Sequence, residues 1–187
     1  MNKTFKSICA IILIAALSVG IGIFAQNLKN KYDIASHPKE YSEYVEKYSA
    51  LYKVPEAICY SVIKCESGFD SAAKSHSGAI GLMQIMPDTF EHLCSLLGEK
   101  HEVGLLYEPE TNIRFGVFYL SVLYDRFGVW DTAFAAYNCG PTRVDEWIKA
   151  GKADESGRLY DIPIEETKTY VGRVNNAIEK YEKLYYQ

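Results

Sequence analysis

The residue of this sequence best placed for acid–base chemistry is a glutamate on an otherwise apolar helix face. Ile58, Val62 and Glu66 follow one another at four-residue intervals, and Phe69 continues the stripe. Residues four apart share one face of an α-helix, so the Glu66 side chain is predicted to project from the face that packs against the rest of the protein. Burial disfavours the charged carboxylate, and the negative end of the helix dipole acts in the same direction near the helix C-terminus.

A carboxyl group whose pKa is raised in this way keeps its proton near neutral pH, as a general acid must. The same pattern also fits a glutamate at a frayed helix end that turns its side chain to water. The pattern alone leaves both interpretations open, and the choice depends on the residues around Glu66.

The elements that would position this glutamate are predicted to be helices joined by short loops. Apolar periodicity and Pro or Gly boundaries predict helices over residues 40–52, 55–67, 87–97, 112–127, 130–138, 141–150 and 165–185. Asp88 fits a helix cap. The short apolar segment bounded by Gly and Pro predicts at most a small β element near residues 78–86. The fold class is therefore mainly α.

The N-terminal segment is predicted to be an export signal or a membrane anchor. Lys3 and Lys6 precede an apolar run over residues 8–25, which is about 27 Å long as a helix and just spans a bilayer core. Ala25 has Ile23 two positions before it, which makes a weak cleavage site. We therefore expect an uncleaved membrane-spanning helix with the rest of the chain outside. Secretion after signal cleavage is the alternative.

The rest of the 187-residue chain suits one domain of ordinary size. We predict an anchor or signal over residues 1–26, a polar tether over 27–39 and a single domain over 40–187. The formal net charge of −4 argues against general nucleic-acid binding, because such binding relies on Lys and Arg to neutralise phosphates.

Four cysteines lie beyond the apolar run: Cys59, Cys65, Cys94 and Cys139. They fit either two disulfides, in three possible connectivities, or four small buried thiols, and the sequence leaves this open. Neither the cysteines nor the histidines show the spacing of metal ligands, so we expect no metal.

The residues that follow Glu66 resemble the signature of the lytic transglycosylase catalytic domain, which is the lysozyme-like domain of the soluble lytic murein transglycosylases. The resemblance begins with Glu66-Ser67, continues through GAIGLMQ at residues 78–84, and ends with Met-Pro-Asp-Thr at residues 86–89. Further blocks follow in the family's order at residues 112–120, 136–141 and 166–171. In the block AYNCGP, Cys139 replaces the family's usual alanine.

The resemblance implies an activity on peptidoglycan glycan strands. The family cleaves the β-1,4 bond between N-acetylmuramic acid and N-acetylglucosamine and leaves a 1,6-anhydromuramoyl end. It uses one carboxylate where most glycosidases use two, so Glu66 would act as general acid and then as general base. Asp70, Asp88 and Asp161 are the candidates for a second carboxylate, and we expect none of them to serve. No cofactor is implied.

The resemblance also implies a set of substrate-binding residues: Ser67, Met83, Gln84, Tyr137, Asn138, Glu166 and Tyr170. Structural roles compete with binding for several of them. Ser67 fits the end of its helix, Gln84 a brace for the loop, and Met83 and Tyr170 the core. We expect Tyr137 to lie near the acid and Glu166 to hold either Tyr137 or the substrate.

Two other functions remain as alternatives. A hydrolytic muramidase on the same fold would need a second carboxylate near Glu66. A catalytically silent peptidoglycan-binding module would be expected to lack the acid, which is present here. The expected partners are glycan strands and, through the N-terminal helix, the membrane. The sequence identifies no protein partner.

Overall fold

The computed structural model describes the backbone of residues 3–187 and the side chains of residue 13 and of residues 16–187. The chain divides into two compact units, Met1–Pro38 and Lys39–Gln187. The first unit contains one helix, α1 (Lys3–Ser36). This helix continues through most of the polar segment that we predicted as a tether, so that segment is helical up to Ser36.

The predicted membrane-spanning helix is not found in the described part of the chain. None of the helices there is both long enough and apolar enough to cross a membrane. Much of the apolar run over residues 8–25 falls on side chains that lie outside the described residues. Among its described side chains, Leu17, Ile21 and Phe24 are exposed.

The second unit is mainly helical, as predicted. Its helices are α2 (Ser42–Tyr52), α3 (Glu56–Glu66), α4 (Pro87–Leu97), η1 (Val103–Tyr107), α5 (Pro109–Phe127), α6 (Trp130–Cys139), α7 (Pro141–Lys149) and α8 (Glu165–Tyr185). All seven predicted helices are confirmed within a few residues of their expected ends. The short 3-10 helix η1 was not predicted.

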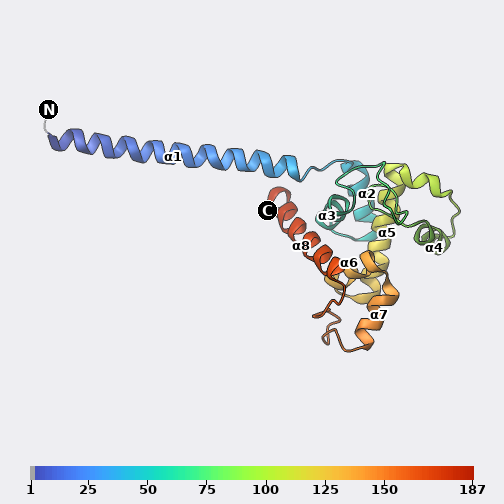
Figure 1. The fold of residues 1–187 in the computed structure, drawn as a ribbon. Coiled ribbons are helices and arrows are strands. Elements are labelled where there is room, and N and C mark those ends of the chain that lie inside the picture. The colour runs from blue at the N-terminus through green and yellow to red at the C-terminus, as the bar shows by residue number, and fades with distance from the viewer. Residues whose placement is uncertain (1–2) are drawn as a thin grey trace. The chain divides into compact units, whose positions relative to one another are not determined.

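The long helix α5 forms the centre of this unit (Figure 1). It packs against α2, α4, α6 and η1, while α8 packs against α3 and α6. The rings of Phe115 on α5, Phe90 on α4 and Phe134 on α6 are almost completely buried between these helices. Because α3 packs against both α2 and α8, all of its residues from Ala57 to Ile63 are buried.

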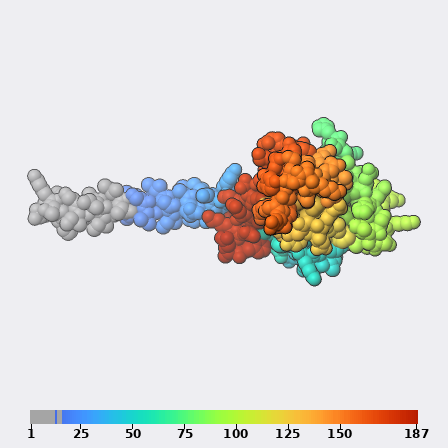
Figure 2. All heavy atoms as spheres, turned by 90° about the horizontal axis from the view of Figure 1, so that it is seen from below, coloured from blue at the N-terminus to red at the C-terminus, as the bar shows by residue number. Residues whose placement is uncertain are grey.

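The predicted small β element is confirmed as isolated bridges between Lys74 and Ile80 and between Ile80 and Ile85. A further bridge joins Ala153 to Leu159 in the loop after α7. Figure 2 shows this loop region in orange, exposed on the surface beside the yellow residues that precede it. The predicted cap role of Asp88 is wrong. The N-cap of α4 is Met86, and Asp88 lies in the first turn, where its negative charge interacts favourably with the helix dipole.

A glycine in α5 allows the loop before α4 to lie directly on this helix. A Cβ atom added to Gly116 would stand 2.3 Å from the Met83 Sδ and 2.8 Å from the Met83 Cβ. Met83 is fully buried, so its side chain has little room to move.

We therefore expect Gly116→Ala to lower the free energy of unfolding by about 1–3 kcal/mol, although alanine favours helices more than glycine does. Gly172→Ala in α8 is the matched control, because an added Cβ there meets no atom within 4 Å and should stabilise the helix. Urea unfolding of both variants checks this. An equal gain of stability in the two would show that the contact with Met83 is not tight.

Candidate active site

Glu66 is the last residue of α3, three positions after the buried residues Ala57–Ile63. Burial raises the pKa of its carboxyl from the ordinary 4.5 to about 7 and outweighs Tyr170 and Arg173, which both lower it. The side chain is half-buried and poorly solvated, in agreement with the apolar stripe and not with a frayed end. A carboxyl group with this pKa can both give and regain a proton near neutral pH.

Two residues of α8 stand beside this acid. The Tyr170 hydroxyl is close enough to Glu66 to lower the pKa of its carboxyl. That hydroxyl is buried, yet it makes no hydrogen bond of ordinary geometry with any described residue. One turn further along α8, the Arg173 guanidinium carbon lies 5.9 Å from the centre of the Tyr170 ring. A buried hydroxyl without a fixed partner is costly, so a role for Tyr170 toward Glu66 or a substrate atom would explain it.

The turn that the bridge between Ile80 and Ile85 closes is held by four side chains that lie far apart from one another in the sequence. Asn112 Nδ2 donates a hydrogen bond to the Ile80 carbonyl at 2.9 Å, and Gln84 Nε2 donates one to the Gly81 carbonyl at 2.9 Å. Ser67 Oγ donates to the Leu82 carbonyl at 2.8 Å, and the Tyr137 hydroxyl donates to the Met83 carbonyl at 2.7 Å. We call residues 80–83 the clamped segment. Each of its four consecutive carbonyls therefore accepts a hydrogen bond from a side chain, and these side chains come from α5, α6, the residue after α3 and the loop itself.

Asn112 is the centre of this arrangement. It is fully buried in α5 and makes two more short hydrogen bonds. Its Nδ2 donates to the Leu106 carbonyl at 2.7 Å, and its Oδ1 accepts from the Met83 N–H at 2.7 Å. Gly81 lies so close that an added Cβ would stand 2.2 Å from the Asn112 Nδ2. Sequence reasoning did not assign Asn112 a role. A buried amide in an otherwise apolar helix was the signal for it.

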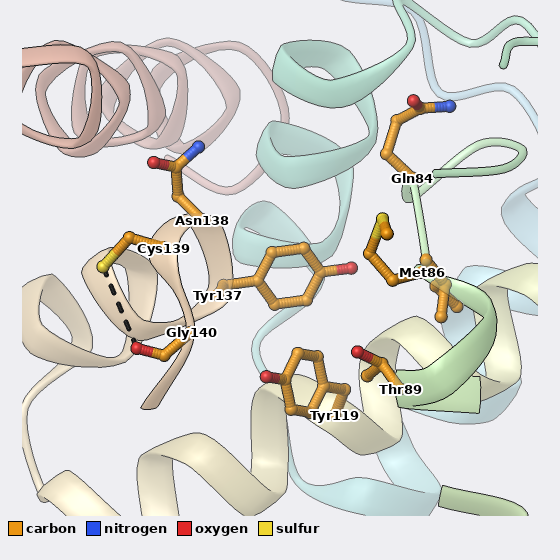
Figure 3. A pocket seen from close by; sticks show the side chains of 9 residues that line it. Gln84, Met86, Thr89, Tyr119, Tyr137, Asn138, Cys139 and Gly140 are labelled. Atoms are coloured by element: carbon orange, nitrogen blue, oxygen red, sulfur yellow. Dashed lines mark hydrogen bonds between the residues drawn. The ribbon is translucent and has the colours of Figure 1, made fainter. Parts of the chain in front are cut away.

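A cavity of about 270 Å³ lies next to the clamped segment (Figure 3). It is lined by Gln84, Ile85, Met86, Thr89, Tyr119, Tyr137, Asn138, Cys139 and Gly140. The Tyr137 ring crosses from α6 toward Met86, with its centre 5.2 Å from that of Tyr119 (Figure 3). Glu66 does not line this cavity, but its charge contributes to raising the pKa of Tyr137 well above the ordinary value, after the larger effect of burial.

Three of the predicted substrate-binding residues, Gln84, Tyr137 and Asn138, thus share one cavity. Sequence reasoning missed the other six lining residues, among them Met86, Thr89 and Tyr119, which belong to the blocks that carry the resemblance.

The other predicted residues lie elsewhere. Met83 is fully buried against Gly116, so its side chain supports the site from the core. Glu166 is exposed in the first turn of α8 and does not hold Tyr137, whose hydroxyl is bonded to the clamped segment. Asn138 Oδ1 accepts a hydrogen bond from the Thr167 hydroxyl at 2.8 Å, which joins the end of α6 to the start of α8.

The three candidates for a second carboxylate do not act on the pKa of Glu66. Asp70 accepts a hydrogen bond from the Ala72 N–H at 2.9 Å, and Asp161 forms an ion pair with Lys152. Asp88 lies in the first turn of α4. No carboxylate is among the groups that shift the pKa of Glu66.

The cysteines near the site are free thiols. Cys65 precedes Glu66, and Cys139 lies in the wall of the cavity. Burial raises the pKa of both, so both are protonated at neutral pH. Cys59 and Cys94 are also free, which favours the second of the two interpretations that the sequence left open.

Known proteins resemble this chain in sequence and in fold. The soluble lytic murein transglycosylase of Escherichia coli K12 is 35% identical over 144 residues, which cover 73% of this chain and 22% of that protein. The membrane-bound lytic murein transglycosylase C of Edwardsiella ictaluri is 27% identical over 196 residues, covering 91% of this chain and 54% of that protein. The chain thus spans between about a fifth and a half of the length of these relatives.

The crystal structure of the 70 kDa soluble lytic transglycosylase Slt70 from Escherichia coli matches the fold with a TM-score of 0.72 and 33% identity. The match covers 81% of this chain and 25% of that one. The sequence model of the transglycosylase SLT domain matches residues 43–159, which include Glu66, the clamped segment and the cavity. This chain belongs to the transglycosylase SLT domain family.

Proposed function

We propose that this protein is a peptidoglycan lytic transglycosylase in which Glu66 is the single acid–base catalyst. The observation that carries the proposal is the pKa of Glu66, which burial raises to about 7 without help from a second carboxylate. The substrate is the glycan strand, cleaved between N-acetylmuramic acid and N-acetylglucosamine.

In the first step, protonated Glu66 donates its proton to the glycosidic oxygen, and the bond between this oxygen and C1 of the muramoyl sugar breaks. The carbonyl of the substrate's own N-acetyl group stabilises the positive charge at C1 from the other face. In the second step, ionised Glu66 takes the proton of the C6 hydroxyl as that oxygen bonds to C1. The anhydro ring closes, Glu66 is protonated again, and no water is added.

We assign the neighbouring residues by where they lie. Gln84, Tyr137 and Asn138 line the cavity and are proposed to contact the sugar. The Tyr170 hydroxyl is proposed to stabilise ionised Glu66 between the two steps, because it is buried beside that carboxyl. Ser67 and Met83 are proposed to position the clamped segment. Glu166, exposed at the start of α8, is proposed to contact the substrate and not Tyr137.

Digestion of purified peptidoglycan by the full chain in detergent, followed by mass spectrometry, tests the proposal. Anhydromuramoyl ends that are absent from the Glu66→Gln digest are the expected result. Reducing ends, heavier by one water, would instead identify a muramidase. Binding of the glycan without cleavage would identify a silent module. Either of these outcomes would overturn the proposal.

The exposed guanidinium of Arg173 should lower the upper pH limit of the reaction. It lowers the pKa of Glu66, so Arg173→Gln should raise that pKa and keep the acid protonated to higher pH. We expect the falling limb of kcat/KM against pH to move upward by as much as about one unit. Arg173→Lys keeps the charge and should keep the wild-type profile. Coincident profiles for all three proteins would contradict the prediction.

We further propose that the catalytic unit acts on the wall-facing side of the membrane and that the N-terminal segment stays attached. The support is the lysine-flanked apolar run and the weak cleavage site. N-terminal sequencing of the protein from the membrane fraction tests this. A processed N-terminus in the medium would show secretion after cleavage instead.

A further inference from the structure

A second cavity lies on the same two helices as the candidate active site but shares no residue with it. Its volume is about 480 Å³, within the range of small-molecule sites. Phe118 of α5 lines this cavity, whereas its neighbour Tyr119 lines the first. On α6, Trp130 at the start of the helix lines the second cavity and Tyr137 near its end lines the first, a rise of about 10 Å along the axis.

Aromatic rings form two walls of this second cavity. Tyr124 stacks on Trp130 with ring centres 4.1 Å apart, and Tyr52 packs on Phe118 with ring centres 5.1 Å apart. Tyr124 is 37% exposed, so part of its ring is open to a ligand. The exposed part of the Tyr124 ring can pack on the apolar C–H face of a pyranose ring.

Charged groups of both signs complete the lining. Lys53 and Asp125 line the cavity and are exposed, and neither forms an ion pair with another described residue. The Ser121 hydroxyl also lines it; this hydroxyl donates to the Phe118 carbonyl at 2.7 Å and keeps its acceptor capacity. A saccharide offers hydroxyl and acetamido groups around its ring edge, which such donors and acceptors can bind while the ring stacks on the walls.

We propose that this cavity is a second saccharide-binding site, which holds a sugar of the glycan strand away from the bond being cleaved. A saccharide is the expected occupant because aromatic side chains and the polar groups of Lys53, Asp125 and Ser121 line the same cavity. The choice of an N-acetylated glycan rests on the proposed function. A strand held here is kept close to the active site, because both cavities are built on α5 and α6.

Binding measured on the inactive full chain tests the site without any need for cleavage. The Glu66→Gln protein is titrated with the tetramer of N-acetylglucosamine, with tryptophan fluorescence as the readout. The chain has two tryptophans, and Trp147 is buried, so Trp130 is the one that a ligand can reach. The same protein is sedimented with isolated peptidoglycan.

Adding Tyr124→Ala to this protein should weaken both interactions about tenfold, the effect of losing an aromatic contact of roughly 1.4 kcal/mol. The matched control is Tyr107→Ala, because Tyr107 is 39% exposed and lines neither cavity. Equal affinities for the two variants would overturn the proposal. Weaker binding to peptidoglycan but unchanged binding of the tetramer would also overturn it, since the site would then bind the peptide.

The proposed activity and this site can fail separately. A wild-type protein that cleaves nothing, yet binds both probes in a Tyr124-dependent way, would refute the transglycosylase and leave the second site in place. Cleavage with no dependence of binding on Tyr124 would do the reverse.

Discussion

Replacing Glu66 with glutamine is expected to abolish cleavage and, at pH 8, to make the fold more stable. Loss of a general acid typically costs about 10²–10⁴-fold in rate, and here one residue serves both steps, so we expect the upper end of that range. The gain in stability has a separate cause. Glutamine fills the same space without an ionisable group, and the pKa of Glu66 is raised to about 7 by burial.

The sign of the pH dependence follows from that shift. Well below pH 4.5 the carboxyl is protonated in both the folded and the unfolded chain, so it imposes no ionisation penalty on folding. As the pH rises from 4.5 toward 7, the unfolded chain releases its proton while the folded chain keeps it, and the native state loses stability. Above pH 7 the loss is complete and amounts to about 3 kcal/mol.

Urea unfolding at about pH 4.5 and about pH 8 measures this effect. The Glu66→Gln and wild-type proteins should have similar stabilities at the lower pH and should differ by up to about 3 kcal/mol at the higher pH. Glu91→Gln, at an exposed position of α4, is the control and should change little at either pH. A difference between Glu66→Gln and wild type that does not depend on pH would show that the acid is not desolvated.

The sequence predicted the helices well because their signals are local. Apolar periodicity and the Pro or Gly residues at their ends locate α4 (Pro87–Leu97) at its predicted limits. Five residues are too few for a periodic pattern, so η1 (Val103–Tyr107) had no signal. The partial burial of Glu66 was also predictable, because it follows from four-residue spacing on one helix.

The roles within the site were less predictable, because they depend on contacts between distant blocks. Ser67 and Gln84 fit substrate binding and structural bracing equally well by sequence, and only the structure shows both bonded to the clamped segment. Met83 and Met86 are three residues apart, yet the first is buried and the second lines the cavity. The turn of the loop between them decides which methionine is buried, and the amino-acid composition of the loop does not predict that turn.

Asn112→Ala is expected to destabilise the fold more than Gly116→Ala does. Asn112 makes three buried hydrogen bonds to backbone groups of the clamped segment and of η1, at 2.7–2.9 Å. Alanine leaves the Met83 N–H and the Leu106 carbonyl without this partner, in a place that water does not reach freely. An unsatisfied buried group costs about 1–3 kcal/mol, so we expect a total loss of about 4 kcal/mol. That is a large share of the roughly 5–15 kcal/mol that stabilises a typical domain.

Two measurements separate a local effect of this substitution from a general one. Thermal unfolding should show a large decrease in Tm, and hydrogen exchange should show faster exchange of the Met83 amide under conditions where the protein is still folded. Asn175→Ala is the matched control. Asn175 lies in α8 and donates one hydrogen bond, to Asp131, so its loss should cost about 1 kcal/mol or less.

The same substitution connects the fold to the proposed activity. The clamped segment provides the carbonyl that holds the Tyr137 hydroxyl at 2.7 Å and the one that holds Ser67 at 2.8 Å, directly after Glu66. If Asn112 fixes this segment, Asn112→Ala should lower kcat even after correction for the unfolded fraction, and Asn175→Ala should not. A folded Asn112→Ala protein with wild-type kcat would show that Ser67, Gln84 and Tyr137 hold the segment without Asn112.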